Sequence, residues 1–478
     1  MKYDLKIPGK VHFAGIAGSA SAPIAIMMRD KGWEVTGSDS NVWEPAKSLL
    51  SNAGVKWTEG YPPELIDDAD ITVFAGESLY QVPENPQLTR AKELNKPILG
   101  FANVVGEILT KENSLVITGA YGKSTTSSII AKILTEAGVD PSFMIGGKPK
   151  DFDSGVKNTE SEYSVVEGDE YVTVVSQDLS PKFKYYKPKF GLITATKWDH
   201  MDVYPTEQSY IDAFIGFAKQ VEENKGNLIV CAYGENNEKV VAQYKGELTT
   251  YMIHGFEKLV EADVNYIATN IKFLPESITF DVILNDKLLG SFETNQMGLP
   301  NVENCLAAIT ITHRSGINVD AIKKGIKNFS GIKRRQELIG KTKNGAIVMD
   351  DFAHSPMKAK AALIAIRTRY SEVGVHVVYM PRLNELGDRE VLKGYMGAFE
   401  LADTVIIPKI RIKKSTAKED RIRGKDLVDA IKVGQPNTIY MPKEERIVDF
   451  VNDVKENDLV VFMSAGGWGE ILNIIISY

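Results

Sequence analysis

The sequence predicts an α/β protein with parallel sheets, divided into about three domains. Its 478 residues are enough for about three domains of ordinary size. Short apolar runs of strand length alternate with segments of helical periodicity along the chain. Several of these runs end in glycine turns or in carboxylates, at the positions where open parallel sheets hold their ligands.

The first domain, predicted over residues 1–110, begins as a strand, a glycine turn, a helix and a second strand. The strand from Lys10 runs into Gly15-x-x-Gly18, and the second strand ends at Asp39, about 20 residues after the glycines. This pattern makes Gly15, Gly18 and Asp39 candidates for binding a nucleotide-containing substrate. Because the full G-x-G-x-x-G pattern is missing, the turn could also be purely structural. Taken alone, it would suggest an NAD-linked oxidoreductase.

The second domain, predicted over residues 111–330, opens with the most specific motif in the chain, Thr118-Gly-Ala-Tyr-Gly-Lys-Ser-Thr125. A strand ends there, and a helix with one apolar face follows as far as Gly138. The N–H groups of such a turn point at a phosphate, Lys123 adds a positive charge and Ser124 offers a hydroxyl to Mg²⁺. The predicted triphosphate-binding residues are Gly119, Gly122, Lys123, Ser124 and Thr125.

Two later strands of this domain end in acidic residues. One ends at Glu167-Gly-Asp-Glu170, and the other ends at residues 199–202, which include His200. Mg²⁺ prefers oxygen ligands and accepts few protein groups, so Ser124 and Glu167 are predicted metal ligands, with His200 close by or ligating. Acidic strand ends of this kind also occur as solvated loop mouths.

The third domain, predicted over residues 331–478, again alternates strands and helices. The strand that begins at Ala346 leads into His354, and a strand over Val375–Met380 is followed by Pro381. Residues 409–425 carry eight lysines and arginines against two acids. That pattern is more typical of a solvated, mobile loop than of an anion site.

Composition excludes several classes of protein. A net charge of −7 argues against general binding to nucleic acid or a membrane surface. Two cysteines are too few for a disulfide scaffold or a cysteine-rich zinc site. No apolar run approaches the roughly 20 residues of a spanning helix, and the start lacks the apolar core of a signal peptide. We therefore expect a cytoplasmic protein.

Taken together, the motifs resemble those of the Mur ligase family, ATP-dependent enzymes that add amino acids or peptides to UDP-N-acetylmuramate in peptidoglycan synthesis. The resemblance implies a Rossmann-like N-terminal domain for the UDP-sugar, a central P-loop ATPase domain and a Rossmann-like C-terminal domain for the amine. Within the family, the motifs are most similar to those of the ligases for the tripeptide L-alanyl-γ-D-glutamyl-meso-diaminopimelate. The L-alanine ligases are a near second. The matching segments are Val166–Tyr171, Lys182–Pro188, Gly331–Arg335, Asp350–His354, Pro381–Asn384 and Met463–Gly469.

The resemblance implies that ATP phosphorylates the muramoyl carboxylate and that the amine then attacks the acyl phosphate. The implied catalytic residues are Lys123, Glu167 and His200, with His200 helping to hold a second metal ion. The implied further ATP contacts are Asn301, which could equally be a capping residue, Arg335 and Asp351. The implied substrate contacts in the third domain are His354 and Arg382, whose guanidinium could bind the carboxylate of the amine bidentately.

The expected cofactors are ATP and Mg²⁺. The expected partners are a UDP-N-acetylmuramate-type nucleotide sugar and an amino acid or peptide, with no nucleic acid and no membrane, in a monomer or weak homodimer. Departures from the family pattern at Ala17, Tyr121 and Ser355 are compatible with a divergent Mur-like ligase that uses another acceptor. They are also compatible with a binding module that keeps the fold without the activity. The NAD-linked oxidoreductase is the alternative from a different class.

Overall fold

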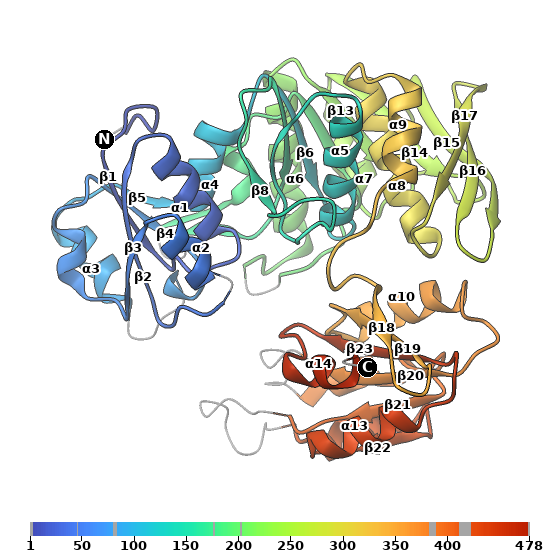
Figure 1. The fold of residues 1–478 in the computed structure, drawn as a ribbon. Coiled ribbons are helices and arrows are strands. Elements are labelled where there is room, and N and C mark those ends of the chain that lie inside the picture. The colour runs from blue at the N-terminus through green and yellow to red at the C-terminus, as the bar shows by residue number, and fades with distance from the viewer. Residues whose placement is uncertain are drawn as a thin grey trace. The chain divides into compact units, whose positions relative to one another are not determined.

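A computed structural model describes residues 3–44, 46–79, 84–174, 177–200, 203–381, 389–410 and 422–476 (Figure 1). The chain forms two compact units. The first comprises Met1–Ile271, Thr279–Thr294 and Val302–Ser330. The second comprises Lys272–Ile278, Asn295–Asn301 and Gly331–Tyr478.

The first unit begins with a parallel sheet that, in the described residues, has five strands in the order β3-β2-β1-β4-β5. This order matches five consecutive strands of the doubly wound Rossmann order 3-2-1-4-5-6, and it confirms the predicted class of the N-terminal region. The strands are β1 (Lys10–Ala14), β2 (Glu34–Asp39), β3 (Lys56–Glu59), β4 (Ile71–Phe74) and β5 (Ile98–Gly100). The helices are α1 (Ser21–Asp30), α2 (Ala46–Asn52) and α3 (Pro86–Glu93), with short 3₁₀ turns η1 (Pro63–Ile66) and η2 (Gly76–Leu79).

The two glycines of the first turn have different structural roles. Gly15 has φ +86°, and a Cβ added there would lie 2.1 Å from the backbone oxygen of Ala75. Only glycine fits at that position. At Gly18 the nearest atom to an added Cβ is the Ser21 hydroxyl, at 3.0 Å, which is a side chain that can move.

The second sheet of this unit has ten strands in the described residues, in the order β17-β16-β15-β14-β13-β12-β6-β9-β7-β8. The strands from β15 to β7 run parallel, and β8 pairs antiparallel with β7. The parallel strands are β6 (Asn113–Thr118), β7 (Ser142–Met144), β9 (Tyr163–Glu167), β12 (Phe190–Ile193), β13 (Asn227–Cys231), β14 (Glu247–Ile253) and β15 (Val264–Phe273). The others are β8 (Val156–Lys157), β16 (Ile278–Leu284) and β17 (Lys287–Thr294), and a separate ribbon holds β10 (Val172–Val174) and β11 (Asp178–Pro181).

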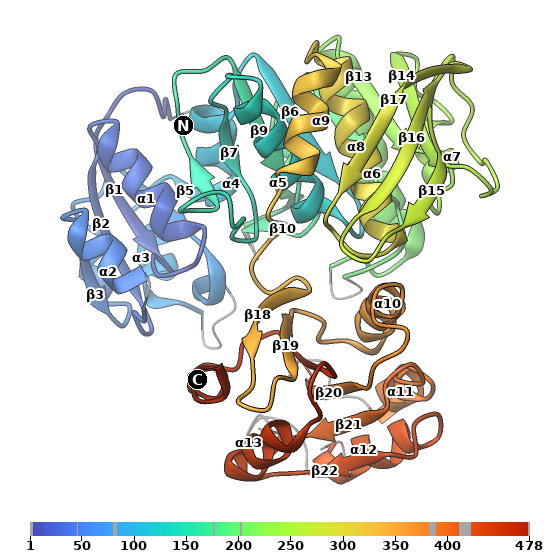
Figure 2. The ribbon, with the colours of Figure 1, turned by 45° about the vertical axis from the view of Figure 1, so that its right-hand side comes forward.

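The helices around this sheet include the one predicted after the phosphate loop. It is α5 (Lys123–Glu136), and Gly138 with φ +78° follows its end. The others are α6 (Glu207–Glu223), α7 (Asn237–Val241), α8 (Leu299–Arg314), α9 (Val319–Lys327) and the 3₁₀ turn η4 (Lys182–Tyr185). Helix α9 lies beside α5 (Figures 1 and 2), and a Cβ on Gly325 would come within 2.6 Å of the Ile133 Cα. The glycine therefore permits this close helix packing.

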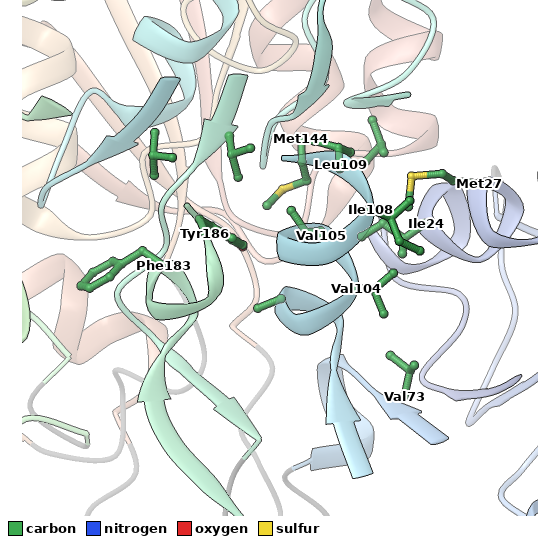
Figure 3. Close-up of a cluster of buried hydrophobic side chains, with 14 of the residues drawn as sticks. Ile24, Met27, Val73, Val104, Val105, Ile108, Leu109, Met144, Phe183 and Tyr186 are labelled. Carbon is green, nitrogen blue, oxygen red and sulfur yellow. The ribbon is translucent and has the colours of Figure 1, made fainter. Parts of the chain in front are cut away.

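One continuous hydrophobic core joins the two sheets of the first unit. The connecting segment is α4 (Phe101–Val104), which continues as the π-helical turn η3 (Val105–Leu109). Figure 3 shows Ile24 and Met27 of α1 on one side of this segment and Met144 and Tyr186 on the other. All four side chains are buried. The segment thus holds α1 and β7 in a defined arrangement.

The second unit contains a sheet with six strands in its described part, in the order β18-β19-β23-β20-β21-β22. β18 is antiparallel to β19, and the other pairs are parallel, as expected for a Rossmann-like C-terminal region. The strands are β18 (Glu337–Lys341), β19 (Ile347–Asp351), β20 (Val375–Met380), β21 (Thr404–Ile407), β22 (Thr438–Tyr440) and β23 (Leu459–Ser464). The helices are α10 (Pro356–Arg367), η6 (Arg389–Val391), α11 (Leu392–Tyr395), α12 (Gly424–Lys432), α13 (Glu444–Asp453) and α14 (Glu470–Ile476). Among the described residues, no helix is long and apolar enough to cross a membrane.

Candidate active site

The phosphate loop joins β6 to α5, and its two glycines are required by geometry. Gly119 has φ +119°, and an added Cβ would lie 2.1 Å from the Thr194 hydroxyl. Gly122 has φ +78° and precedes the first residue of α5, and its Cβ would lie 2.4 Å from the side-chain oxygen of Asn304. The loop therefore presents bare backbone at the N-terminus of a 14-residue helix. Such an arrangement binds anions.

Lys123, the first residue of α5, forms a buried ion pair. Its Nζ lies 2.9 Å from a carboxylate oxygen of Glu170 and donates to the backbone oxygen of Gly119 at 2.5 Å. The side chains of Lys123 and Glu170 are 15% and 2% exposed. Burial opposes the charge of Lys123, but the carboxylates of Glu170 and Asp169 outweigh it and raise the lysine's pKa. Lys123 is therefore cationic, as phosphate binding requires.

Ser124, the next residue of α5, contacts Glu167 at the end of β9. The Ser124 hydroxyl donates to one carboxylate oxygen of Glu167 at 2.9 Å, and the N–H of Gly146 donates to the other at 2.8 Å. Burial raises the pKa of Glu167, although the Lys123 charge opposes that rise. A hydroxyl and a carboxylate fit Mg²⁺, which keeps water and phosphate oxygens as its other ligands. The described residues hold no cluster of three or more His, Cys, Asp or Glu suited to a metal. Thr125 follows in the same turn of α5.

His200 lies with Glu170 and Lys123 rather than in the Ser124–Glu167 pair. Its Nε2 is 3.3 Å from Glu170 Oε1, and its ring centre lies 5.1 Å from that of Tyr171 in a T-shaped arrangement. Burial lowers the pKa of His200, but the hydrogen bond and charge of Glu170 overcome this and raise it. Glu170, which was not among the predicted site residues, links the two basic side chains. The sequence did contain a signal for this residue, because Glu170 is the third acid in the segment Glu167–Glu170.

A cleft of about 1130 Å³ in the first unit contains all three residues predicted to bind the nucleotide sugar. Gly15, Gly18 and Asp39 line it from one side, and residues 145–148 line it after β7. Gly146, whose N–H holds Glu167, belongs to that second group. The Asp39 carboxylate accepts from the N–H of Ala17 at 2.9 Å, so it also holds the glycine turn in shape.

In the second unit, two adjacent arginines have different environments. Arg334 pairs with Asp350 at 3.3 Å and donates to the backbone oxygen of Ala465 at 3.0 Å. Arg335, the predicted ATP contact, is exposed, with its guanidinium 5.0 Å from the ring centre of Phe352. Arg334 therefore stabilises the fold, whereas the guanidinium of Arg335 is accessible to a ligand.

The other predicted residues of this unit are mostly internal. Asp351 is buried, and its oxygens accept from the N–H groups of Gln336 at 2.9 Å and Ala353 at 2.7 Å. Burial raises the pKa of the Asp351 carboxyl, and the charge of Arg335, which lowers it, only partly offsets this effect. His354 is buried, with Nδ1 2.8 Å from the backbone oxygen of Phe352.

Two predicted residues remain. Asn301 lies in the first turn of α8, and its amide donates to the backbone oxygen of Met297 at 2.7 Å. Arg382 lies outside the described residues, as do residues 411–421 of the basic run.

The fold and the site define an enzyme that binds a nucleoside triphosphate at the phosphate loop and has a second cleft for a substrate. Three family models match the chain: the Mur ligase family catalytic domain over residues 10–112, the Mur ligase middle domain over 117–312 and the Mur ligase glutamate ligase domain over 334–466. The chain belongs to the Mur ligase family, and it is an ATP-dependent amide-bond ligase of peptidoglycan synthesis. This membership disfavours the NAD-linked oxidoreductase.

Relatives of similar length are about 30% identical to this chain in sequence. The UDP-N-acetylmuramate–L-alanine ligase of Pelotomaculum thermopropionicum is 31% identical over 464 residues, covering 95% of this chain and 94% of the relative. That of Alkaliphilus metalliredigens is 30% identical over 460 residues, with 95% and 94% covered.

Two solved structures have the same fold over 98% of both chains. The UDP-N-acetylmuramate–alanine ligase of Thermotoga maritima has a TM-score of 0.77 at 20% identity. A murein peptide ligase of Psychrobacter arcticus has a TM-score of 0.70 at 23% identity.

Proposed function

We propose that the protein joins L-alanine to UDP-N-acetylmuramate. The names of the relatives at 30–31% identity support L-alanine over the tripeptide that the motifs favoured. The observation that carries the proposal is the cleft, which links the glycine turn at Gly15 to Gly146 and, through Glu167, to Ser124. A nucleotide sugar bound along it would bring its carboxylate toward the phosphate loop.

In the proposed reaction, a carboxylate oxygen of the muramoyl group attacks the γ-phosphorus of ATP. The bond between the γ-phosphorus and the oxygen that bridges it to the β-phosphate breaks. ADP departs, and the muramoyl carboxylate is now an acyl phosphate. The amine of L-alanine then attacks the carbonyl carbon, a C–N bond forms, inorganic phosphate leaves and the amine loses a proton. Charge neutralisation and positioning supply most of the catalysis in such a transfer.

Lys123 is proposed to neutralise the charge of the transferred phosphoryl group. Glu170, at 2.9 Å, holds the lysine side chain in place. Ser124 and Glu167 are proposed to hold Mg²⁺, which when bound neutralises phosphate charge. His200, 3.3 Å from Glu170, is proposed to act beside the acyl phosphate, where a second metal ion would sit.

In the rest of the chain, the proposed nucleotide contacts are Asn301, Arg335 and Asp351, and the proposed amine-substrate residues are His354 and Arg382. We propose domain limits of 1–110, 111–330 and 331–478, and a cytoplasmic monomer or weak homodimer.

The direct test is ADP release by the full chain with ATP, Mg²⁺ and UDP-N-acetylmuramate, supplied with L-alanine, the tripeptide or no amine. We expect release that depends on L-alanine and a product of matching mass. Release with the tripeptide alone would favour a murein peptide ligase, the activity named for the Psychrobacter arcticus neighbour. Absence of release with every amine would indicate that the fold is kept without the activity.

A further inference from the structure

Thr194, the residue that follows β12, lies against the backbone of the phosphate loop. It is buried, and its hydroxyl donates to the backbone oxygen of Tyr121 at 2.7 Å. The same hydroxyl is the atom nearest to a Cβ added at Gly119, at 2.1 Å. Strands β12 and β6 are neighbours in the sheet, which places the end of β12 directly beside the loop. Thr194 therefore supports the loop from a different part of the sequence.

The hydrogen bond from Thr194 fixes the direction of one peptide group of the loop. The C=O and the N–H of a trans peptide group point in opposite directions. Because the Tyr121 oxygen points at Thr194, the N–H of Gly122 points away from it. Gly122 directly precedes α5, so its N–H belongs to the group that an anion meets at the N-terminus of this helix. The Thr194 hydroxyl thus orients an N–H that can donate to a phosphate.

Gly122 by itself does not select this orientation. It has φ +78°, and glycine adopts positive and negative φ about equally well. Rotation of the Tyr121–Gly122 peptide group would therefore cost little at Gly122. The rotated peptide would present a carbonyl oxygen, the negative end of its dipole, to the phosphate. A contact outside the loop is needed to hold the favourable orientation.

Thr194 is itself held in place by a buried amide. Asn237, the first residue of α7, is fully buried, and its amide nitrogen donates to the backbone oxygens of Thr194 at 3.3 Å and Cys231 at 3.0 Å. Its side-chain oxygen accepts from the Thr196 hydroxyl at 3.0 Å. Buried polar groups that are hydrogen-bonded in this way hold a single arrangement. The position of Thr194 is therefore set by the ends of β12 and β13.

We propose that Thr194 is a positioning residue that selects the anion-binding orientation of the Tyr121–Gly122 peptide group. This inference rests on the proposed function, because it requires the phosphate loop to bind the nucleotide. It adds a residue that acts through the backbone of the loop rather than through its own contact with the nucleotide.

The first test is calorimetric titration of the full chain with ADP, in the wild type and in Thr194→Val, Thr194→Ser and Thr249→Val. Valine lacks the hydroxyl but has a similar volume, so Thr194→Val should weaken ADP binding about tenfold. Thr194→Ser keeps the hydrogen bond and should stay within about threefold of the wild type. Thr249 of β14 is also fully buried, and its hydroxyl has no hydrogen-bond partner in the part of the chain that the structure describes. Thr249→Val should therefore bind ADP as the wild type does.

The second test observes the Gly122 N–H by NMR. The sequence contains two Tyr–Gly pairs, Tyr121–Gly122 and Tyr233–Gly234, so labelling with ¹³C-carbonyl tyrosine and ¹⁵N-glycine gives two correlated signals. ADP should move the Gly122 amide proton downfield in the wild type, because hydrogen bonds to ionised phosphate oxygens are strong. Gly234, whose N–H already donates to the Cys231 oxygen at 3.1 Å, is the internal control. The shift should be largely lost in Thr194→Val and kept in Thr194→Ser.

Three results would overturn the inference while leaving the proposed function standing. They are equal ADP affinity in the wild type and Thr194→Val, equal loss of affinity in Thr194→Val and Thr194→Ser, and an unmoved Gly122 signal in wild type that binds ADP. If Thr194→Val does not fold, Thr194→Ala and Thr194→Ser give the same comparison, because they differ only in the hydroxyl. Failure of the wild type to bind ADP would overturn the proposed role of the phosphate loop and this inference together.

Discussion

Glu170 and Lys123 form an ion pair of 2.9 Å in which the glutamate side chain is almost fully buried. The same carboxylate reaches His200 at 3.3 Å, so one acid orients both basic groups of the candidate active site. A buried carboxylate without a partner is strongly unfavourable, which ties the placement of Lys123 to the stability of the loop.

Lys123→Ala is expected to lower ADP release at least about hundredfold, because the charge that stabilises the transferred phosphoryl group is lost. It should also lower the free energy of unfolding by about 3 kcal/mol, since Glu170 stays buried. Steady-state kinetics and chemical denaturation measure the two effects. Lys219→Ala, an exposed position on α6, is the control. Adding Glu170→Gln to Lys123→Ala should restore stability but not turnover; recovered turnover would contradict the role of Lys123.

His200 should give the protein a pH-dependent increment of stability. Glu170 raises the pKa of His200 above its usual 6.5, so the folded state binds the proton more tightly than the unfolded state. The increment is therefore complete below pH 6.5 and is lost as the pH rises through the raised pKa. Unfolding free energies of the wild type and His200→Gln should converge above that pKa. In NMR titrations, His313, whose pKa burial lowers, should titrate below His200. The opposite order would disprove this assignment.

Ser124 and Glu167 should control the Mg²⁺ requirement. Ser124→Ala and Glu167→Gln are each expected to raise the Mg²⁺ concentration for half-maximal ADP release about tenfold or more. Ser124→Thr keeps a hydroxyl in the same turn and should behave as the wild type. Magnesium titrations at saturating ATP measure the change. An unchanged requirement in both variants would place the metal elsewhere.

Arg334 and Arg335 should separate stability from nucleotide binding. Arg334→Ala leaves Asp350, 8% exposed, without its ion-pair partner and should cost about 2–3 kcal/mol of unfolding free energy. Arg335→Ala removes an exposed guanidinium and should leave stability unchanged while raising the KM for ATP. Thermal denaturation and ATP kinetics on both variants provide the comparison. If Arg335→Ala unfolds the protein, the assignment of the two residues is reversed.

Most of the fold could be predicted because local patterns encode it. The strand predicted over Val375–Met380 is β20 with the same limits, and the predicted helix after the phosphate loop is α5, followed by Gly138 in the left-handed conformation. Apolar strand-length runs and glycine stops are local signals, so they can be recognised without knowing the partners of each strand.

The site was less accessible because its contacts are between distant parts of the chain. The segment Glu167–Glu170 could be recognised in the sequence as the acidic end of a strand. Its sequence does not predict that Glu167 contacts Ser124 while Glu170 contacts Lys123. Likewise, nothing in the sequence around Arg334 and Arg335 predicts which arginine forms the internal ion pair and which one is exposed.

The sequence by itself determined the α/β class, the phosphate loop, the family and the set of residue types available for chemistry. Those features depend on neighbours within a few positions or on motifs in order along the chain. The tertiary structure alone decided which acid pairs with which base and that one cleft joins the glycine turn at Gly15 to Gly146. These outcomes depend on strand order and packing, which bring together groups more than forty positions apart, such as Lys123 and Glu170.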